Sequence, residues 1–562
     1  MKHHFLILKL MSLLIAAALL FVGCAGTGSE NETAATTDKS GSESEAVTTA
    51  SADETTASSD DTGYEALKYS GELLSTQRVS VHDPSIVYNT ENGRYYVFGS
   101  HRAWAMSRNL ASWVTFSLAL DSTYEDVLAE AAAWASNGSS SYDVSGNMWA
   151  PDVIYNEAMG KWCMYMSVNG DNYYSSIVLL TADSINGKYE YVGAIVYSGF
   201  TNKSEASETD FYDVVESKSE ITRYISNGSW NSSYGPNAID PCVFYDENGD
   251  LWMSYGSWFG GIFLLKLDNE TGLRDYTYTY EYEMSVSDPY LGYHISGGYG
   301  ASGEGSYIVW DKDAGYYYLY VSYCGLDATD SFSGYHIRLF RSETVNGPYY
   351  DSAGNTAVVT SATESQTRKG IKLFGNYYFS SLKGNGENSR SGYMSGGHNS
   401  AFIDSDGQHY LVYHTRFNLG NEWHELRVHQ QFMNEDGWPV TAVYEFLGSV
   451  ISEDGYDTDE IVGTYEYVNH GTSATTAYTD ILETLTVTLN ADGTITGDVE
   501  GTWDEHTGDD GLGYYCTFVI GSHTYKGVFF KQYDESKNNV ETMTFTLIGD
   551  NDTAIWGSKV SD

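Results

Sequence analysis

Between residues 81 and 438 the chain repeats one pattern of polar and apolar positions. Each unit has a polar residue, a short apolar run, a turn rich in Asp, Asn and Gly, and a second run rich in aromatic residues. Two such runs joined by such a turn predict a β-hairpin. The five units are 82–98, 149–165, 239–255, 303–320 and 397–413.

The spacing of the units predicts how many strands each one contributes. The polar residues that begin them lie 64 to 94 residues apart, which leaves room for two more strands and long loops per unit. Four strands per unit, repeated five times, predict an all-β, five-bladed β-propeller over 71–455. Helical periodicity is confined to a short stretch near 124–135.

The pattern changes after Trp438. From about Ile461 short runs alternate strictly, as in 483–489, and are separated by Asp-Gly and Asn-Gly-type turns. Roughly 100 residues of short strands predict a small C-terminal β-barrel or sandwich, assigned here to 456–562.

The N-terminus has the pattern of an export signal. Lys2 and Lys9 flank a charged start, and an apolar run follows from Leu10 to Val22. Residues 1–23 resemble a bacterial lipoprotein signal, which implies that Cys24 is lipidated and anchors the protein at the outer surface of the cell membrane. An ordinary cleaved signal is the alternative. Residues 24–70 are rich in Ser, Thr and acids and predict a disordered tether.

Composition and charge restrict the partners. The 562 residues include 49 Tyr, 13 Trp and 57 Gly, and the formal net charge is −47. Such a field repels nucleic acid and disfavours a polyanionic substrate. The many aromatic residues suit both half-buried strands and sugar stacking, so a neutral polysaccharide is the favoured partner.

Four further cysteines lack metal-site spacing: Cys163, Cys242, Cys324 and Cys516. Each lies in or beside an apolar run, which predicts buried free thiols. A disulfide stays open as the alternative.

The propeller geometry gives the repeated polar residues a common location. The first strand of each blade lies nearest the axis, so the residues that begin it should surround one mouth of the central channel. These residues are Asp83, Asp152, Asp240, Glu304 and His398. Clustered carboxylates repel one another, and a ring of them therefore indicates function.

Carboxyl groups in such a ring suit glycoside hydrolysis. The reaction needs one protonated carboxyl group for the leaving sugar and one ionised carboxylate for water. A third carboxylate can raise the pKa of the acid by repulsion.

The quoted units resemble a known enzyme family. The segments 81–85, 149–152, 237–241 and 303–308 are similar to the signature blocks of glycoside hydrolase family 43. The segments 252–262 and 396–400 resemble its endo-α-1,5-L-arabinanase branch, and the C-terminal piece resembles the accessory barrel of two-domain extracellular members.

The resemblance implies a role for each matching residue. Asp83 would be the general base, Glu304 the general acid and Asp240 the modulator of its pKa, in a reaction that inverts the anomeric centre. His398 would hold one axial cation, usually calcium. Asp152 would line the substrate funnel, and the candidates for sugar stacking are Trp149, Trp258, Phe259 and Trp104.

Three functions stay open at this point. The first is an endo-acting arabinanase that degrades arabinan, a neutral plant polysaccharide. The second is an exo-acting α-L-arabinofuranosidase or β-xylosidase of the same family, because the same carboxyl groups serve all of them. The third is a non-catalytic surface propeller that binds glycans, against which three clustered acids argue.

Overall fold

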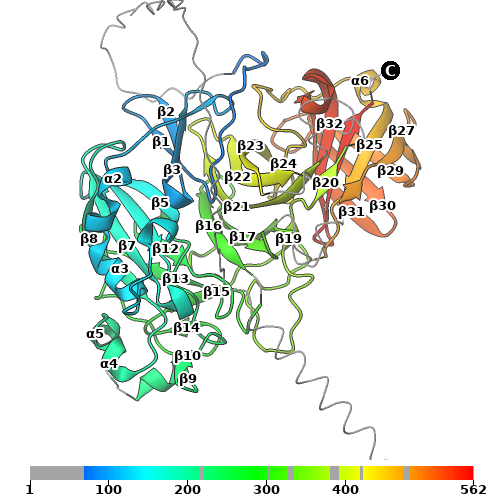
Figure 1. Ribbon diagram of the computed structural model, residues 1–562. Coiled ribbons are helices and arrows are strands. Elements are labelled where there is room, and N and C mark those ends of the chain that lie inside the picture. The colour runs from blue at the N-terminus through cyan, green and yellow to red at the C-terminus, as the bar shows by residue number, and fades with distance from the viewer. Residues whose placement is uncertain are drawn as a thin grey trace, which may run out of the picture. The chain divides into compact units, whose positions relative to one another are not determined.

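The computed structural model describes residues 69–215, 217, 219–301, 303–326, 334–379, 392–417, 422–473 and 481–560. Five antiparallel sheets surround a common axis, and a closed eight-stranded barrel follows them in the chain (Figure 1). The prediction of an all-β protein with a five-bladed propeller and a small C-terminal barrel is therefore confirmed.

The first two blades are four-stranded sheets in sequential order. Blade I contains β1 (Ser85–Asn89), β2 (Arg94–Gly99), β3 (Ala103–Ser107) and β4 (Trp113–Thr115). Blade II contains β5 (Met148–Asn156), β6 (Lys161–Val168), β7 (Ser176–Ala182) and β8 (Glu190–Tyr197).

Blade IV is also a four-stranded sheet in sequential order, whereas blades III and V carry extra strands. Blade III contains β11 (Cys242–Tyr245), β12 (Leu251–Tyr255), β13 (Ile262–Lys266), β14 (Ser287–Asp288) and β15 (Gly292–Ser296). Blade IV contains β16 (Glu304–Asp311), β17 (Tyr316–Tyr323), β18 (His336–Ser342) and β19 (Ile371–Lys372). Blade V contains β20 (Tyr377–Tyr378), β21 (Tyr393–Ile403), β22 (His409–Phe417), β23 (His424–Met433) and β24 (Pro439–Thr441), with β26 (Leu482–Glu483) on its edge.

Short helices and one small hairpin connect the blades. The helical segment expected near residues 124–135 is present as two short helices. The α-helices are α2 (Leu120–Val127), α3 (Ala129–Ala135), α4 (Lys203–Ala206), α5 (Phe211–Val214) and α6 (Thr458–Ile461). The hairpin is formed by β9 (Ile225–Ser226) and β10 (Ser229–Trp230). The 3-10 turns are η1 (Ser100–Arg102), η2 (Val144–Gly146), η3 (Asp171–Tyr173), η4 (Glu220–Arg223) and η6 (Glu535–Lys537).

The repeated hairpins form as their sequence predicts. The turn between the first two strands of every blade contains a glycine at positive φ, which a residue with a side chain adopts only with strain. These glycines are Gly93, Gly160, Gly249, Gly315 and Gly407. The second strands are buried on both faces, as in β6, because each blade packs between two others.

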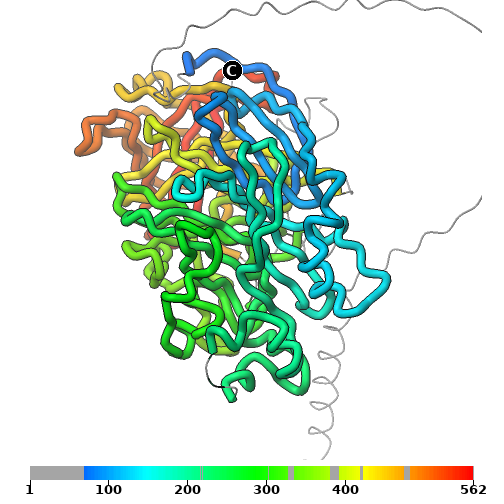
Figure 2. The backbone as a smooth tube through the Cα atoms, turned by 90° about the vertical axis from the view of Figure 1, so that its left-hand side faces the viewer, coloured from blue at the N-terminus to red at the C-terminus, as the bar shows by residue number. Residues whose placement is uncertain are grey.

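The ring closes without exchange of strands between blades. The innermost strands contact one another in the cyclic order β1, β5, β11, β16, β21 and back to β1, and Figure 2 follows the chain around this ring from blue to yellow. The seam between blades V and I is filled by Val97, Tyr410 and Val428. A backbone hydrogen bond from Leu426 N–H to the Val79 carbonyl, 3.0 Å long, also joins it.

The barrel has a densely packed aromatic interior and a shared core with the propeller. Its strands are β25 (Gly463–Asn469), β27 (Leu485–Leu489), β28 (Thr494–Gly497), β29 (Gly501–His506), β30 (Tyr515–Ile520), β31 (His523–Asp534), β32 (Val540–Gly549) and β33 (Ala554–Lys559). Trp556 of the barrel lies in one hydrophobic cluster with Tyr377 and Val440 of blade V. The two parts therefore depend on each other for burial of apolar surface.

The four cysteines of the described residues are buried thiols that form no disulfide with one another, as predicted. Among the described residues, no helix has the length and apolar character needed to cross a membrane.

Candidate active site

Five residues at equivalent positions bend the chain where it enters the innermost strand of each blade. All five have positive φ: Asp83, Ala150, Asp240, Gly305 and His398. For the four that carry a side chain, this left-handed conformation costs about 1–3 kcal/mol each. Bulges in β5, β16 and β21 surround the same positions. Such bulges re-aim side chains and are frequent beside active sites.

The repeat places Asp83, Asp240 and His398 in register, but not Asp152 and Glu304. Asp152 lies two residues beyond the bend of its blade, and Glu304 lies one residue before its own. The residues that directly precede the bends are His82, Trp149, Ile239, Glu304 and Gly397. Aligning Pro84, Pro151 and Pro241 would have revealed this register, because each follows its bend directly.

Asp83 is held by a dense set of donors. His82 Nδ1 lies 2.8 Å from Asp83 Oδ2, and His398 Nδ1 lies 3.0 Å from Oδ1. The Ser100 hydroxyl also donates to Oδ2, and the Asp83 N–H donates to His414 Nδ1 over 3.2 Å. Burial alone would raise the pKa of Asp83, but the charges of His398 and His82 outweigh it and hold the pKa well below its usual range. Asp83 is therefore ionised at neutral pH.

Asp240 has the opposite electrostatic environment. Burial raises the pKa of Asp240 well above its usual range, and the charges of Glu304 and Asp83 raise it further. The one described donor to its carboxylate is the Gly305 N–H, 3.3 Å from Oδ2. Asp240 therefore resists carrying a negative charge in this position.

Glu304 is fixed by residues from two blades. Trp258 Nε1 and Ser257 Oγ donate to Glu304 Oε2 over 2.5 and 3.1 Å, and Tyr335 Oη donates to Oε1 over 2.7 Å. Oε2 therefore accepts two hydrogen bonds and Oε1 accepts one. A Cβ at Gly397 would lie 2.3 Å from the Tyr335 ring, so the glycine gives this tyrosine its space.

The turn that carries Trp258 is strained. Trp258 and Phe259 have φ values of 54° and 49°, and the Gly261 N–H donates to the Trp258 carbonyl over 2.9 Å. This turn aims the Trp258 indole N–H at Glu304. Trp258, which the sequence predicts as a stacking residue, thus orients the Glu304 carboxyl group.

Asp152 does not face the mouth of the channel. Only 2% of its surface is exposed. Its carboxylate accepts hydrogen bonds from the Ser85 hydroxyl, from Val243 N–H over 2.5 Å and from Val153 N–H over 3.1 Å. Burial raises its pKa to about 6, although these hydrogen bonds oppose the shift. It joins three innermost strands inside the channel, so the expectation that it lines the substrate funnel is not met.

The predicted stacking residues differ in exposure. Trp104 is a core residue with 2% of its surface exposed, and its indole N–H donates to Asp121 Oδ1 over 2.8 Å. It cannot stack on a sugar, so that prediction is wrong. Trp149, Trp258 and Phe259 are half-buried. The Trp149 indole N–H donates to the Gly146 carbonyl over 2.8 Å.

The sequence did not predict several residues that lie at the site. Ser100 begins the 3-10 turn η1, and Ser257 and Tyr335 lie between strands, where no repeat marks them. His82 and Asn399 lie in the quoted motifs but were not assigned a role. Trp423 is 54% exposed, next to His424, whose ring centroid lies 5.2 Å from that of His82.

A cavity lies in the channel beside the bends of the innermost strands. Its lining includes Asp83, Asp240, His398, Asn399 and Ser306. The amide group of Asn399 is buried, and neither its oxygen nor its nitrogen has a hydrogen-bond partner in the part of the chain that the structure describes. Gly305 leaves room for the imidazole ring of His398, since a Cβ there would lie 2.8 Å from its Cγ.

A propeller mouth that holds an ionised Asp83 and two further carboxyl groups, Asp240 and Glu304, has the groups that a glycoside hydrolase needs. The glycosyl hydrolases family 43 model matches residues 195–439, and a C-terminal lipocalin-like domain model matches 444–557. Extracellular endo-alpha-(1->5)-L-arabinanase 2 of Bacillus subtilis is 37% identical over 499 residues, which are 86% of this chain and 93% of that protein. The chain therefore belongs to glycosyl hydrolases family 43.

Two further matches, a sequence and a crystal structure from Thermotoga petrophila, support this membership. Its extracellular endo-alpha-(1->5)-L-arabinanase is 35% identical over 495 residues, covering 86% of this chain and 94% of the relative. A crystal structure of endo-1,5-alpha-L-arabinanase from strain RKU-1 superimposes with a TM-score of 0.71 at 34% identity, covering 87% of this chain and all of the other. The likeness includes both the propeller and the C-terminal barrel.

Proposed function

We propose that this protein is an extracellular endo-α-1,5-L-arabinanase, which cleaves internal bonds of arabinan. The observation that carries the proposal is the electrostatic contrast at the mouth: the pKa of Asp83 is held low while that of Asp240 is raised beside Glu304. The relatives from Bacillus subtilis and Thermotoga petrophila, which each match 86% of the chain, are named as enzymes of this activity.

The proposed mechanism assigns a proton to each carboxyl group. Ionised Asp83 accepts a proton from the attacking water, and Glu304 gives its proton to the leaving sugar oxygen. Buried Asp240 lies beside Glu304 and is proposed as the modulator of the acid, as the family resemblance implies. Water attacks opposite the leaving group, so the configuration at the anomeric carbon inverts.

Substrate contacts are proposed for three half-buried aromatic residues at the mouth. Trp149 directly precedes the bend of blade II, and Trp258 and Phe259 lie on the turn beside the acid. Their exposed ring faces would stack on sugar units next to the scissile bond.

Hydrolysis of linear arabinan tests the proposal. We expect a ladder of oligosaccharides of mixed length early in the reaction, and NMR should show the inverted anomer first. Early release of a single short product would instead support the exo-acting alternative. No hydrolysis of arabinan or of aryl arabinofuranosides and xylosides would contradict the enzymatic proposal.

We also propose a calcium ion in the channel cavity, as the family resemblance implies. His398 Nδ1 faces Asp83, so its Nε2 is the nitrogen available to a cation, and the unpartnered amide oxygen of Asn399 suits calcium. His82, Asp83 and His414 also bring ligand atoms within 4.8 Å of one another, but hydrogen bonds already join them. A bound cation would bias Asp83 further toward its ionised form.

Elemental analysis of the purified protein tests the metal. We expect about one calcium per chain, and less in Asn399→Ala and His398→Ala. Full activity in excess chelator, with no stoichiometric metal, would assign both residues a structural role.

The location at the cell surface is proposed from the N-terminal sequence, which lies outside the described residues. A lipid on Cys24 would anchor the protein, and Cys24→Ala should then release it to the medium or leave an unprocessed precursor. A variant that fractionates with membranes and is processed like the parent would contradict the anchor.

A further inference from the structure

A pocket on blade III adjoins the turn that orients the catalytic acid. Gly260 lines this pocket, and Trp258, two residues earlier, donates to Glu304. The hydrogen bond from Gly261 N–H to the Trp258 carbonyl closes the turn, and the ends of such a turn lie within about 7 Å. One turn therefore contributes both to the catalytic site and to the wall of the pocket.

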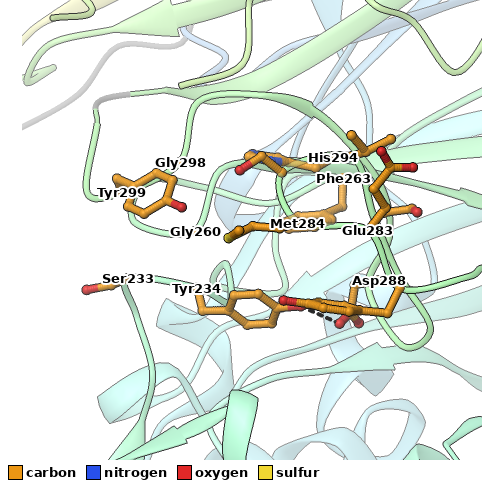
Figure 3. Close-up of a pocket in the computed structure, with 14 residues that line it drawn as sticks. Ser233, Tyr234, Gly260, Phe263, Glu283, Met284, Asp288, His294, Gly298 and Tyr299 are labelled. Atoms are coloured by element: carbon orange, nitrogen blue, oxygen red, sulfur yellow. Dashed lines mark hydrogen bonds between the residues drawn. The ribbon is translucent and has the colours of Figure 1, made fainter. Parts of the chain in front are cut away.

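The pocket gathers exposed apolar side chains. Tyr282, Met284, Val286 and Tyr299 all line it, with exposed fractions of 48%, 68%, 45% and 38%. Exposed apolar side chains scattered singly are ordinary, but a group around one concavity indicates a binding surface. Figure 3 shows Met284 and Tyr299 on one side of the pocket and Tyr234 on the other.

The aromatic rings are held in place by their neighbours. The Arg223 guanidinium lies 4.1 Å from the centroid of the Tyr282 ring, and Arg223 Nε lies 3.6 Å from Asp288 Oδ2. The Tyr234 hydroxyl donates to the same carboxylate oxygen over 2.5 Å, drawn as a dashed line in Figure 3. Rings that are already ordered lose little entropy when a ligand binds.

The chemistry of the pocket favours a neutral, hydroxyl-bearing ligand. The positive charge of Arg223, which contacts Tyr282, is offset by the carboxylate of Asp288. Glu283 adds a negative charge to the lining, and the chain as a whole carries −47, which disfavours an anionic ligand. Aromatic faces with a few polar groups at their rim are the usual composition of a specific ligand pocket.

We infer that the blade III pocket is a second saccharide-binding site, which holds neutral sugar units of the polysaccharide chain whose scissile bond lies at Glu304. The inference rests on the proposed function and extends it. Binding at the pocket increases the affinity for long chains, because both contacts belong to one molecule and the second is made at high effective concentration. Short oligosaccharides that fill only the catalytic site gain nothing from it.

The test compares long and short substrates in the double variant Tyr282→Ala/Tyr299→Ala. We expect kcat/KM on linear arabinan to fall about tenfold, since a lost aromatic contact commonly corresponds to about two- to tenfold in affinity. Hydrolysis of arabinotriose should stay unchanged. Affinity electrophoresis in gels that contain linear arabinan, in a Glu304→Gln background, should show the same loss of binding.

Two further variants serve as controls. Tyr276→Ala removes a 51% exposed tyrosine on the connection of the same blade, outside the pocket, and should leave both substrates unaffected. Met284→Ala removes the most exposed of the four apolar lining side chains without changing Arg223, and it should reproduce part of the loss on polymer.

The possible outcomes separate this inference from the proposed function. An equal loss on polymer and arabinotriose, or no loss on either, overturns the second site. A double variant that is monomeric where the wild type is dimeric in light scattering also overturns it, because the pocket would then bind a second copy. Absence of hydrolysis by the wild type, with polymer binding that the double variant weakens, contradicts the proposed activity but supports the site.

Discussion

The mouth of the propeller channel and its interior use the same residue type in opposite ways. Asp83 at the mouth is surrounded by imidazoles and a hydroxyl, which hold its pKa low. Asp152, inside the channel on the neighbouring blade, is bonded to one hydroxyl and two backbone amides, and burial raises its pKa to about 6. The imidazole neighbours of Asp83 favour its ionised form, as the proposed base requires, whereas the hydrogen bonds of Asp152 join the innermost strands.

The largest expected effect is at the mouth. Asp83→Ala and Glu304→Gln should each lower kcat on arabinan by about 10²–10⁴-fold or more, because each removes a positioned base or acid. Thermal stability should change little, since the blades have separate cores. Asp313→Ala, in the exposed turn that follows the strand of Glu304, is the matched control. Activity of either variant within about tenfold of wild type would contradict the assignment.

The interior should respond in the opposite way. Asp152→Ala leaves the buried amides of Val243 and Val153 without their acceptor, which should lower the free energy of unfolding by about 2–5 kcal/mol. Denaturant unfolding measures this loss. The kcat of the folded fraction should stay within about tenfold of wild type, below the loss typical of a catalytic acid or base. A folded, stable variant with little activity would place Asp152 among the catalytic groups.

The pH dependence of stability sharpens the contrast. The pKa of Asp152 is raised in the folded state to about 6, so its favourable contribution is fully present below the unfolded value of about 3.9 and is lost as pH rises through about 6. The free energy of unfolding should therefore fall by up to about 3 kcal/mol less between about pH 4 and pH 6 in Asp152→Asn than in the wild type. If the free energy of unfolding of the two proteins depends on pH in the same way across this range, the raised pKa of Asp152 is contradicted.

The smallest expected effect concerns a neighbour of the base. His82→Gln keeps a donor near Asp83 Oδ2 but removes an imidazole that lowers the pKa of Asp83, so this pKa should rise. Since the base works above its pKa, the acid limb of the kcat/KM profile should move to higher pH, with a change of less than about tenfold at neutral pH. A uniform loss at every pH would indicate a structural role instead.

The sequence could predict these features to different degrees. The hairpins are local, and their turn glycines and apolar runs lie close together in the chain, so the number of blades was predictable. Asp83, Asp240 and His398 begin repeats and were found for that reason. Asp152 and Glu304 also begin runs, but bulges shift them by two residues and by one relative to the bend.

By itself, the sequence determined the five hairpin units, the all-β fold and most of the acids at the mouth, because short-range patterns encode them. Only the tertiary structure decided that Asp152 lies inside the channel and that Trp104 lies in the core. It also decided that Ser100, Ser257 and Tyr335 reach the acids. These positions depend on ring closure and on loops of irregular length, which bring together residues from different blades, and no local pattern in the chain records such contacts.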